Sequence, residues 1–360
     1  MAATKRILVA LSGGVDSSVC VYLLKKQGHD VAGVVLKMSP AHDQTVADAQ
    51  EAADALGIPL YVKDMGESFD RNVIDYFVSE YQNGRTPNPC VVCNPTVKFR
   101  ALIEAADEYG YDFVATGHYA DLIERDGKVF LARGECKQRD QSYMLYRLTQ
   151  RELKRLIFPL NHMDKKQVRE IAEEANLPCA KKPDSQEICF IPDNNYAQFI
   201  IERTGQMSKP GDFIAPDGTV CGQHKGIIHY TVGQRKHLGI ALGRPVFVKR
   251  IDPVENKIYL ADAGDEYYAR AVVRDVSITT GETLQRCRAQ VKIRSVAPLA
   301  GAEVIPMEDG RVEVRFDEPQ RAVARGQSIV FYTPEEIVTG GGFVEEVFEE
   351  NDPAEEGGNC

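Results

Sequence analysis

Two glycines, an acid and several hydroxyls follow an apolar run near the amino terminus. Residues 8–19 read Leu-Val-Ala-Leu-Ser-Gly-Gly-Val-Asp-Ser-Ser-Val. Glycines let backbone N–H groups approach an anion without an obstructing Cβ, and a helix that begins here points its N-terminus at the same place. Asp16 could hold Mg²⁺ beside that anion. These residue types favour a phosphate-binding loop, although a glycine pair after a strand also forms ordinary turns.

Spacing distinguishes this stretch from two other catalytic loops. The G-x-x-x-x-G-K-[ST] pattern of a Walker-type loop is absent, and no lysine follows the glycines. The G-x-S-x-G pattern of a nucleophile elbow is absent as well. The stretch is therefore neither a Walker-type loop nor a mount for a nucleophilic serine.

Three cysteines form the second group of residues with chemical potential. Cys90 and Cys93 have C-x-x-C spacing after a Thr-Pro-Asn-Pro segment, and Cys189 follows another proline-containing segment. Proline disfavours a helix interior, so we expect Cys90 and Cys93 to lie on a loop. A closed zinc site needs four ligands, and the fourth is not evident. Spacing alone leaves open a redox pair, an iron–sulfur site, a zinc site or an unremarkable pair.

Strand-like and helical segments alternate around these residues, which predicts a parallel sheet with helices on both faces. The expected strands are 7–11, 31–37, 59–62 and 113–116, and the expected helices are 17–27, 45–56, 69–81 and 97–109, followed by 150–156 and 165–176. Ligands of such sheets gather at the carboxyl ends of the strands. The stretches 12–14 and 116–118 both lie at that edge.

The amino-acid composition changes near residue 205, where glycine and proline become frequent. Short strands are expected at 246–249, 257–260, 289–294, 312–316 and 328–332. This spacing is typical of small β domains and barrels. We therefore expect a catalytic domain over 1–205, a small central domain over 206–270, a β-barrel over 271–347, and an acidic, disordered tail over 348–360.

Composition sets limits on partners and location. The 360 residues carry a net charge of −10, which argues against nucleic acid, but seven acids lie after residue 342, and without them the charge is −3. Basic clusters remain at 181–182, at 224–225 with 235–237, and at Lys292 with Arg294. The odd number of nine cysteines does not suggest a disulfide framework. With no membrane-spanning stretch or signal peptide evident, we expect a cytoplasmic protein.

The glycine loop resembles the pyrophosphate loop of the ATP pyrophosphatase (PP-loop) superfamily, whose members cleave ATP between the α- and β-phosphates. Further stretches are similar to the bacterial tRNA-specific 2-thiouridylase family. Two of them carry the cysteines: Gly-Arg-Thr-Pro-Asn-Pro at 84–89 with Cys-Asn at 93–94, and Lys-Pro-Asp-Ser at 182–185 with Ile-Cys-Phe-Ile at 188–191. The others are the segments 115–120, 140–146 and 229–240, and a long motif over 312–332. The resemblance runs from residue 6 to about 347.

The resemblance implies an α/β architecture: a parallel-sheet PP-loop (adenine nucleotide α-hydrolase-like) domain that binds ATP, a small central tRNA-binding domain and a C-terminal β-barrel. It also implies ATP and Mg²⁺ as cofactors, tRNA as the partner, and thiolation of the wobble uridine in the tRNAs for Lys, Glu and Gln. A sulfur donor, either a cysteine desulfurase or a sulfur-relay protein, is a further implied partner. We expect no membrane contact and a monomer.

Site residues carry over motif by motif. The resemblance makes Cys93 the nucleophile and Cys189 the persulfide carrier, with a transient Cys93–Cys189 disulfide, and Asp16 part of the catalytic loop. The implied ATP-binding residues are Ala10, Leu11, Ser12, Gly13, Gly14, Val15, Asp16, Ser17, Leu36 and Gly117. The implied tRNA contacts are Asn88, Pro89, Cys90, His118, Arg139, Asp140, Gln141, Arg294, Ser295 and Gln327.

These residue types suit the chemistry. The uridine 2-oxygen is a poor leaving group, and adenylation lets it leave C2 as part of AMP. A persulfide carries sulfur in protected form, and the thiolate is the reactive state of both cysteines, so a lowered thiol pKa is expected. A transient catalytic disulfide is compatible with a reducing cytosol.

Two departures from the family leave alternatives open. Many members carry an acid where Cys90 stands, so Cys90, Cys93 and Cys189 could instead hold three irons of a [4Fe–4S] cluster. The segment 37–46 is also short, which leaves the identity of the sulfur donor undetermined. An amidating or lysine-adding PP-loop ligase would not need these cysteines, and a binding protein whose loop no longer turns over would not need Asp16.

Overall fold

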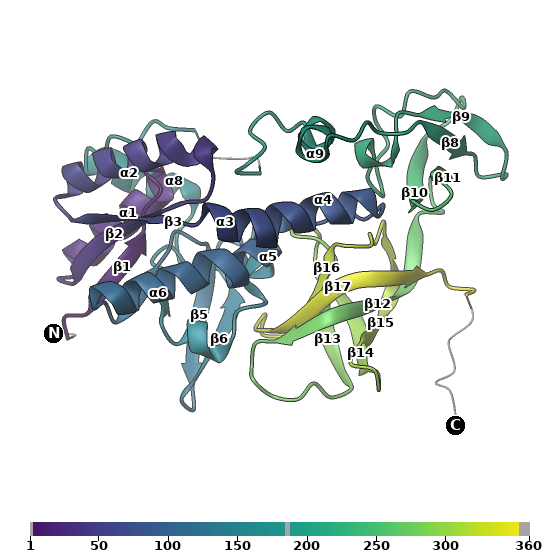
Figure 1. The fold of residues 1–360 in the computed structure, drawn as a ribbon. Coiled ribbons are helices and arrows are strands. Elements are labelled where there is room, and N and C mark those ends of the chain that lie inside the picture. The colour runs from purple at the N-terminus through teal and green to yellow at the C-terminus, as the bar shows by residue number, and fades with distance from the viewer. Residues whose placement is uncertain (1–2, 184–187, 353–360) are drawn as a thin grey trace.

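A five-stranded parallel sheet forms the amino-terminal part of the computed structural model, which describes residues 3–183 and 188–352 (Figure 1). Its strand order is β3-β2-β1-β4-β7, and every neighbouring pair is parallel. The strands are β1 Arg6–Ala10, β2 Asp30–Lys37, β3 Leu60–Asp64, β4 Phe113–Ala115 and β7 Leu156–Ile157. The predicted α/β class is therefore confirmed.

Helices cover both faces of this sheet, as Figure 1 shows. Ile7 and Val9 pack with α1 (Val15–Lys26), α2 (Asp43–Leu56) and α8 (Lys165–Glu174), whereas Leu8 packs with helices of the other face. Because successive side chains of a strand point to opposite faces, β1 must be apolar throughout. Its continuous apolar run is what made this strand recognisable in the sequence.

Two helical stretches on the second face contain a π-helical turn each. The first comprises α3 (Gly66–Phe69), a π turn at Asp70–Ile74 and α4 (Asp75–Gln82). The second comprises α5 (Pro89–Cys93), a π turn at Asn94–Lys98 and α6 (Phe99–Tyr109). Such π turns are frequent at functional sites.

The expectation that Cys90 and Cys93 lie on a loop is wrong, because both belong to α5. Pro89 occupies the first turn of that helix, where a missing N–H costs nothing, and the Asn88 side chain caps the helix by accepting a hydrogen bond from the Cys90 N–H. The proline that was taken to exclude a helix therefore starts one.

Several short elements complete this part of the chain. A hairpin of β5 (Ala120–Arg125) and β6 (Lys128–Arg133) was not predicted. The helix expected over 150–156 ends early as α7 (Gln150–Leu153), and the residues after it form the edge strand β7. The chain then reaches α9 (Tyr196–Thr204).

Two β structures follow. The central sheet has the order β10-β11-β8-β9 and consists of β8 Gly211–Ile214, β9 Val220–His224, β10 Val246–Asp252 and β11 Lys257–Asp262. The closed barrel has the order β12-β15-β14-β13-β16-β17. Its strands are β12 Tyr267–Ile278, β13 Cys287–Lys292, β14 Ala300–Pro306, β15 Val312–Arg321, β16 Ser328–Tyr332 and β17 Val338–Phe348. The predicted barrel is confirmed.

The domain boundaries given above stay predictions. Of the seven acids after residue 342, Glu345 and Glu346 belong to β17, where both pair with Arg311. The tail was expected to begin at 348, and its residues 353–360 lie outside the described residues. Within 3–183 and 188–352, no helix is long and apolar enough to span a bilayer.

The first prediction concerns Gly13, which has φ +70° and whose added Cβ would lie 2.3 Å from the Asp48 carbonyl carbon. We expect Gly13→Ala to destabilise the protein by about 1–3 kcal/mol, measured as the free energy of unfolding. Gly127→Ala is the matched control, since Gly127 has φ +72° and nothing within 4 Å of an added Cβ. Equal losses in both variants would show that the contact with α2 contributes nothing.

Candidate active site

The glycine loop is held in one conformation by its own hydroxyls. Ser17 Oγ accepts a hydrogen bond from the Ser12 N–H at 3.2 Å and donates to the Gly14 carbonyl at 3.1 Å. Ser18 Oγ donates to the same carbonyl at 2.9 Å. Gly14 is the N-cap of α1, so the loop opens at the positive end of a helix, which favours an anion.

Two glycines let neighbouring segments close on this loop. A Cβ on Gly13 would overlap Asp48 of α2, and a Cβ on Gly117 would lie 3.0 Å from the Cβ of Asp16. Strand register places the residues after β4 beside those after β1, because Val9 pairs with Ala115. The structure thus brings the predicted ATP residues together at one edge of the sheet, and Leu36 ends the buried part of β2 at that edge.

Asp16 is fixed by two partners that sequence reasoning missed. Its Oδ1 accepts hydrogen bonds from Lys165 Nζ and from the Tyr119 hydroxyl, each at 2.8 Å. Lys182 pairs with Asp48 at 3.0 Å, beside Gly13. Two lysines from distant segments thus lie beside the loop, each paired with a carboxylate.

A Mg²⁺ ion that arrives with a nucleotide needs only one or two carboxylates, because phosphate oxygens and water complete its shell. Asp16 meets that requirement, and its carboxylate would then bind the metal in place of Lys165. The site therefore fits a nucleotide with its Mg²⁺.

The three cysteines lie close together at α5. Cys90 and Cys93 are three residues apart and share one face of the helix, with Cys93 buried and Cys90 exposed. Cys189 is exposed, but its neighbours Ile188 and Phe190 pack into the same hydrophobic core as Cys93. Among the described residues, no three His, Cys, Asp or Glu side chains are arranged to hold a metal ion.

The surrounding protein atoms desolvate the thiols of this cluster. Desolvation raises the pKa of the buried Cys93 to about 12, and it also raises the pKa of Cys189 to about 11 and that of Cys90, although part of each of these two residues is exposed at the surface. The Lys98 cation opposes the rise in pKa at all three thiols. The lowered thiol pKa expected from the sequence is thus wrong for this conformation, in which the thiols stay protonated at neutral pH.

His118 connects the cysteine cluster with the loop. Its Nδ1 lies 2.7 Å from the Thr116 hydroxyl, and its ring packs against Phe99 and Phe158. Burial, with a smaller effect of Lys98, places the His118 pKa well below its ordinary value. His118 is therefore neutral, and its backbone directly follows Gly117 at the loop.

The other residues expected to contact RNA take part in internal contacts. Asp140 is buried and accepts hydrogen bonds from Arg133 Nε at 3.0 Å and from the Ser142 N–H at 3.1 Å. The Asp140 carboxylate thus makes internal contacts in this structure, and its assignment as a tRNA contact stays a prediction. Gln141 Oε1 accepts from the Tyr119 N–H, whereas Arg139 is exposed.

On the carboxyl-terminal side, Arg294 donates to the carbonyls of Val232 and Ala322 at 3.0 and 2.9 Å. Gln327 donates to the Thr86 carbonyl at 2.8 Å. Arg294, next to Ser295, thus joins the barrel to the central part of the chain, and Gln327 joins the barrel to the segment before α5.

Two further cysteines differ in their surroundings. Cys20 is buried in α1. Cys287 is exposed and begins β13 of the barrel.

The second prediction concerns Lys98. Because its cation favours the thiolate, Lys98→Met is expected to raise the pKa of Cys90 and Cys189 and to shift the pH profile of their alkylation by iodoacetamide upward. Peptide mass spectrometry measures the rate at each cysteine. Arg100→Met is the control, since Arg100 is exposed and pairs with Glu104. An unchanged profile in Lys98→Met would contradict this electrostatic role.

Known proteins resemble this chain over nearly all of its length. Family models described as tRNA methyl transferase HUP domain, tRNA methyl transferase PRC-barrel domain and Aminomethyltransferase beta-barrel domain match residues 5–193, 197–262 and 271–344. A protein of Clostridium perfringens named tRNA-specific 2-thiouridylase MnmA is 46% identical, over 95% of this chain and 98% of its own. A protein of the same name from Acetivibrio thermocellus is 44% identical, over 95% and 99%.

A solved structure, an NMN synthetase from Francisella tularensis, is 20% identical and covers 57% of this chain and 79% of its own with a TM-score of 0.35. That likeness is too weak to carry an argument. The relatives and the family models agree along the sequence, and this chain belongs to the tRNA-specific 2-thiouridylase family.

Proposed function

We propose that this protein uses ATP to activate the 2-oxygen of the wobble uridine in the tRNAs for Lys, Glu and Gln, and then replaces that oxygen with sulfur. The observation that carries the proposal is the link between two sites through one segment. Gly117 packs against Asp16 of the loop, and the adjacent His118 contacts Phe99. Phe99 begins α6, which the π turn Asn94–Lys98 joins to the cysteine-bearing helix α5. An adenylated uridine at the loop would therefore face the thiols.

In the first step the uridine 2-oxygen attacks the α-phosphorus of ATP, and pyrophosphate leaves. Mg²⁺, when bound, neutralises charge on the phosphates. The loop N–H groups and the end of α1 hold the triphosphate, and Lys165 and Lys182 offset its charge. The segment from Asn88 to Cys90 faces the base in this proposal.

In the second step the outer sulfur of a persulfide on Cys189 attacks C2, and AMP leaves. The Cys93 thiolate attacks the inner sulfur, so that the S–S bond breaks and its electron pair stays with the sulfur on C2. The products are 2-thiouridine, AMP and a Cys93–Cys189 disulfide, which an external thiol must reduce. In a variant of this step, Cys93 first frees hydrosulfide, which then attacks C2.

Exposure supports this division of roles. Cys189 is exposed, as a residue that receives sulfur from a donor protein must be, whereas Cys93 is buried behind it. The donor is a cysteine desulfurase or a sulfur-relay protein in this proposal. Cytoplasmic location, the monomeric state and the domain boundaries at 205, 270 and 347 stay predictions.

A second candidate mechanism rests on Cys90, which replaces the acid found in many family members. In it, Cys90, Cys93 and Cys189 hold a [4Fe–4S] cluster. The described residues do not present three such side chains in metal-binding geometry, so the residues in this conformation do not fit the group. We therefore derive no step through a cluster.

The third prediction tests the roles of the cysteines. Protein is incubated without oxygen with ATP, Mg²⁺, a persulfide donor and unmodified tRNA for Glu, and the nucleosides are then analysed by mass spectrometry. We expect Cys93→Ser and Cys189→Ser to lose 2-thiouridine, whereas Cys90→Ser retains it. Loss in Cys90→Ser as well would favour the cluster. Release of AMP without 2-thiouridine in the unaltered protein would favour a ligase.

The fourth prediction separates an enzyme from a binding protein. Asp16→Asn is expected to lower the rate of AMP release by roughly 10²–10³, because the carboxylate needed beside the phosphates is lost, while tRNA binding is retained. Gel-shift and AMP-release assays measure the two properties. Retained AMP release would exclude Asp16 from the catalytic machinery.

A further inference from the structure

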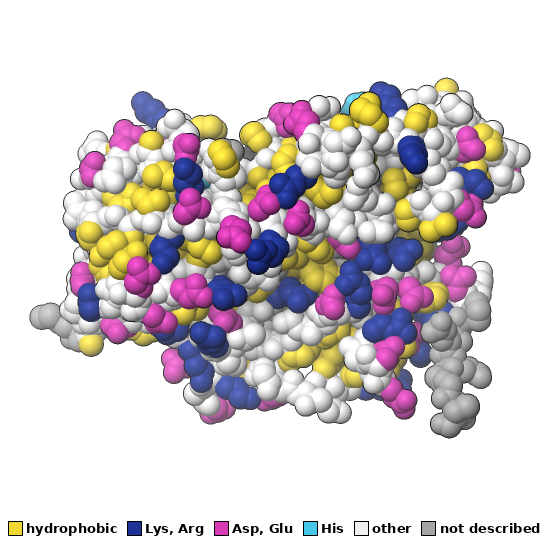
Figure 2. All heavy atoms as spheres, viewed as in Figure 1, with side chains coloured by type: hydrophobic (Ala, Val, Ile, Leu, Met, Phe, Trp, Pro, Cys, Tyr) yellow, Lys and Arg dark blue, Asp and Glu magenta, His cyan; other side chains and the backbone are white. Residues whose placement is uncertain are grey.

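Segment 140–146 lies where the barrel, the phosphate-binding loop and the cysteine helix meet. Its sequence is Asp-Gln-Ser-Tyr-Met-Leu-Tyr, and most of these residues are buried. Its Asp140 pairs with Lys292 of the barrel at 3.9 Å inside the protein, in contrast to the interspersed Lys, Arg, Asp and Glu side chains on the face that Figure 2 shows. A buried charge needs specific partners, so such a segment has one defined place in the fold.

The barrel holds this segment through strand β16. The Tyr143 hydroxyl donates to the Ser328 carbonyl at 2.9 Å and accepts from the Ser328 N–H at 3.2 Å. The Tyr146 hydroxyl lies 3.2 Å from Ser328 Oγ, and Ser142 Oγ lies 3.3 Å from the Tyr332 hydroxyl. Buried hydrogen bonds are costly to break, because the separated groups have no water to bond instead. The segment therefore keeps its place relative to the barrel.

The same segment reaches the phosphate-binding loop through Tyr119. The Gln141 N–H donates to the Tyr119 carbonyl at 2.8 Å, and the Gln141 side chain accepts from the Tyr119 N–H at 3.0 Å. Tyr119 is thus held by both of its backbone groups, and its hydroxyl donates to Asp16 Oδ1 at 2.8 Å. This hydroxyl would keep the carboxylate oriented when Mg²⁺ takes the place of Lys165.

Both ends of the cysteine helix are attached to one residue of the segment, Met144. Asn88, the N-cap of α5, donates to Met144 Sδ at 3.3 Å. Asn94, the C-cap of α5, is buried and donates to the Met144 carbonyl at 2.8 Å. Since Cys93 directly precedes Asn94, the second of these bonds lies next to the buried thiol.

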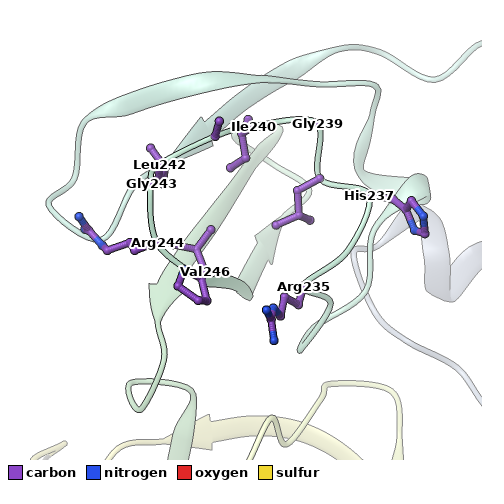
Figure 3. Close-up of a pocket in the computed structure, with 11 residues that line it drawn as sticks. Arg235, His237, Gly239, Ile240, Leu242, Gly243, Arg244 and Val246 are labelled. Atoms are coloured by element: carbon purple, nitrogen blue, oxygen red, sulfur yellow. The ribbon is translucent and has the colours of Figure 1, made fainter.

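Segment 140–146 is a support rather than a ligand pocket. A cavity of about 290 Å³ lies within the turn from Arg235 to Val246, and Figure 3 shows the side chains that line it. A second cavity, of about 760 Å³, lies between this turn, the end of α4 and the start of α9. None of the described residues that line these two cavities belongs to segment 140–146. Its contribution to the reaction is therefore geometric.

We propose that segment 140–146 fixes the position of Asp16 relative to Cys93, with Tyr119 and Asn94 as the positioning residues of its two arms. The inference rests on the proposed function and deepens it, because in that reaction the loop and the thiols act on the same uridine. Reacting groups have to be held within roughly 0.5 Å of their productive geometry. Two sites attached to one buried support meet this requirement, although they belong to distant parts of the chain.

The fifth prediction uses two assays that need no product formation. Calorimetry gives the Kd of α,β-methylene ATP with and without Mg²⁺, and peptide mass spectrometry gives the rate at which iodoacetamide alkylates Cys93. Tyr119→Phe keeps the ring but removes the donor to Asp16, so the Kd with Mg²⁺ should rise roughly tenfold, with the Kd without Mg²⁺ and the alkylation rate unchanged. Asn94→Ala removes a buried hydrogen bond that holds α5, so alkylation should become roughly fivefold faster, with both Kd values unchanged.

The support itself is tested with Tyr143→Phe, which removes both hydrogen bonds to the Ser328 backbone and should change both readouts. The matched control is Tyr268→Phe, since Tyr268 is a buried tyrosine of β12 whose hydroxyl donates to the Lys249 carbonyl at 3.1 Å. Melting temperatures check the fold of each variant. If Tyr143→Phe does not fold, Tyr146→Phe takes its place with the same expected result.

A support variant that matches the control in either readout overturns the proposal. So does an Asn94→Ala protein with unchanged alkylation, or a Tyr119→Phe protein whose Kd rises equally with and without Mg²⁺, because the hydroxyl would then have only a general structural role. Neither readout requires sulfur transfer, so the proposed reaction is judged separately. If the unaltered protein makes no 2-thiouridine and the variants behave as expected, the support stands while the proposed reaction fails.

Discussion

The approach of Gly117 to Asp16 is the contact on which the rest of the site depends. An added Cβ on Gly117 would lie 3.0 Å from the Asp16 Cβ, so a larger residue would force the segment after β4 and the loop after β1 to move apart by a few tenths of an ångström. Tyr119 then reaches the Asp16 carboxylate with its hydroxyl, and His118 turns toward Phe99. One close approach thus aligns a phosphate-binding loop with a cysteine helix that begins more than 70 residues after it.

Burial sets the chemical state of that helix. A thiol whose pKa is about 12 is a poor nucleophile at neutral pH, so Cys93 is held inactive in this conformation. Lys98 acts in the opposite direction, but burial has the larger effect. A bound nucleotide and RNA would change the surroundings of both residues. The same packing that buries Cys93 thus keeps its thiol protonated at neutral pH.

The sequence predicted the parts of the fold that depend on local pattern. β1 was recognisable because both faces are buried, and the barrel because its strands recur between turns. The β5–β6 hairpin was missed although its turn, Asp126-Gly127, has the positive φ angles of +51° and +72° that such dipeptides favour. The Asp-Gly dipeptide is thus a local sequence signal for this hairpin.

Other features could not be predicted because they depend on contacts between distant segments. Lys165 lies 149 residues from Asp16, and nothing near it in the sequence marks it as a partner of the loop. The short β7 strand has two residues, too few for any periodic pattern, and exists because it pairs with β4. The burial of Asp140 follows from Arg133 and Ser142 around it. The family resemblance located this residue but could not distinguish a buried carboxylate from an exposed one.

The barrel and the central sheet also act on the cysteine helix through specific contacts. The Thr86 N–H donates to the Arg325 carbonyl, and the Thr86 carbonyl accepts from Gln327, so the barrel holds the segment two residues before Asn88, the cap of α5. Arg294 ties the same barrel to Val232 in the central part of the chain. The barrel therefore contacts both the segment before α5 and the central part of the chain. Since the cap of α5 fixes where that helix begins, the position of Cys90 and Cys93 depends on how these distant parts are held together.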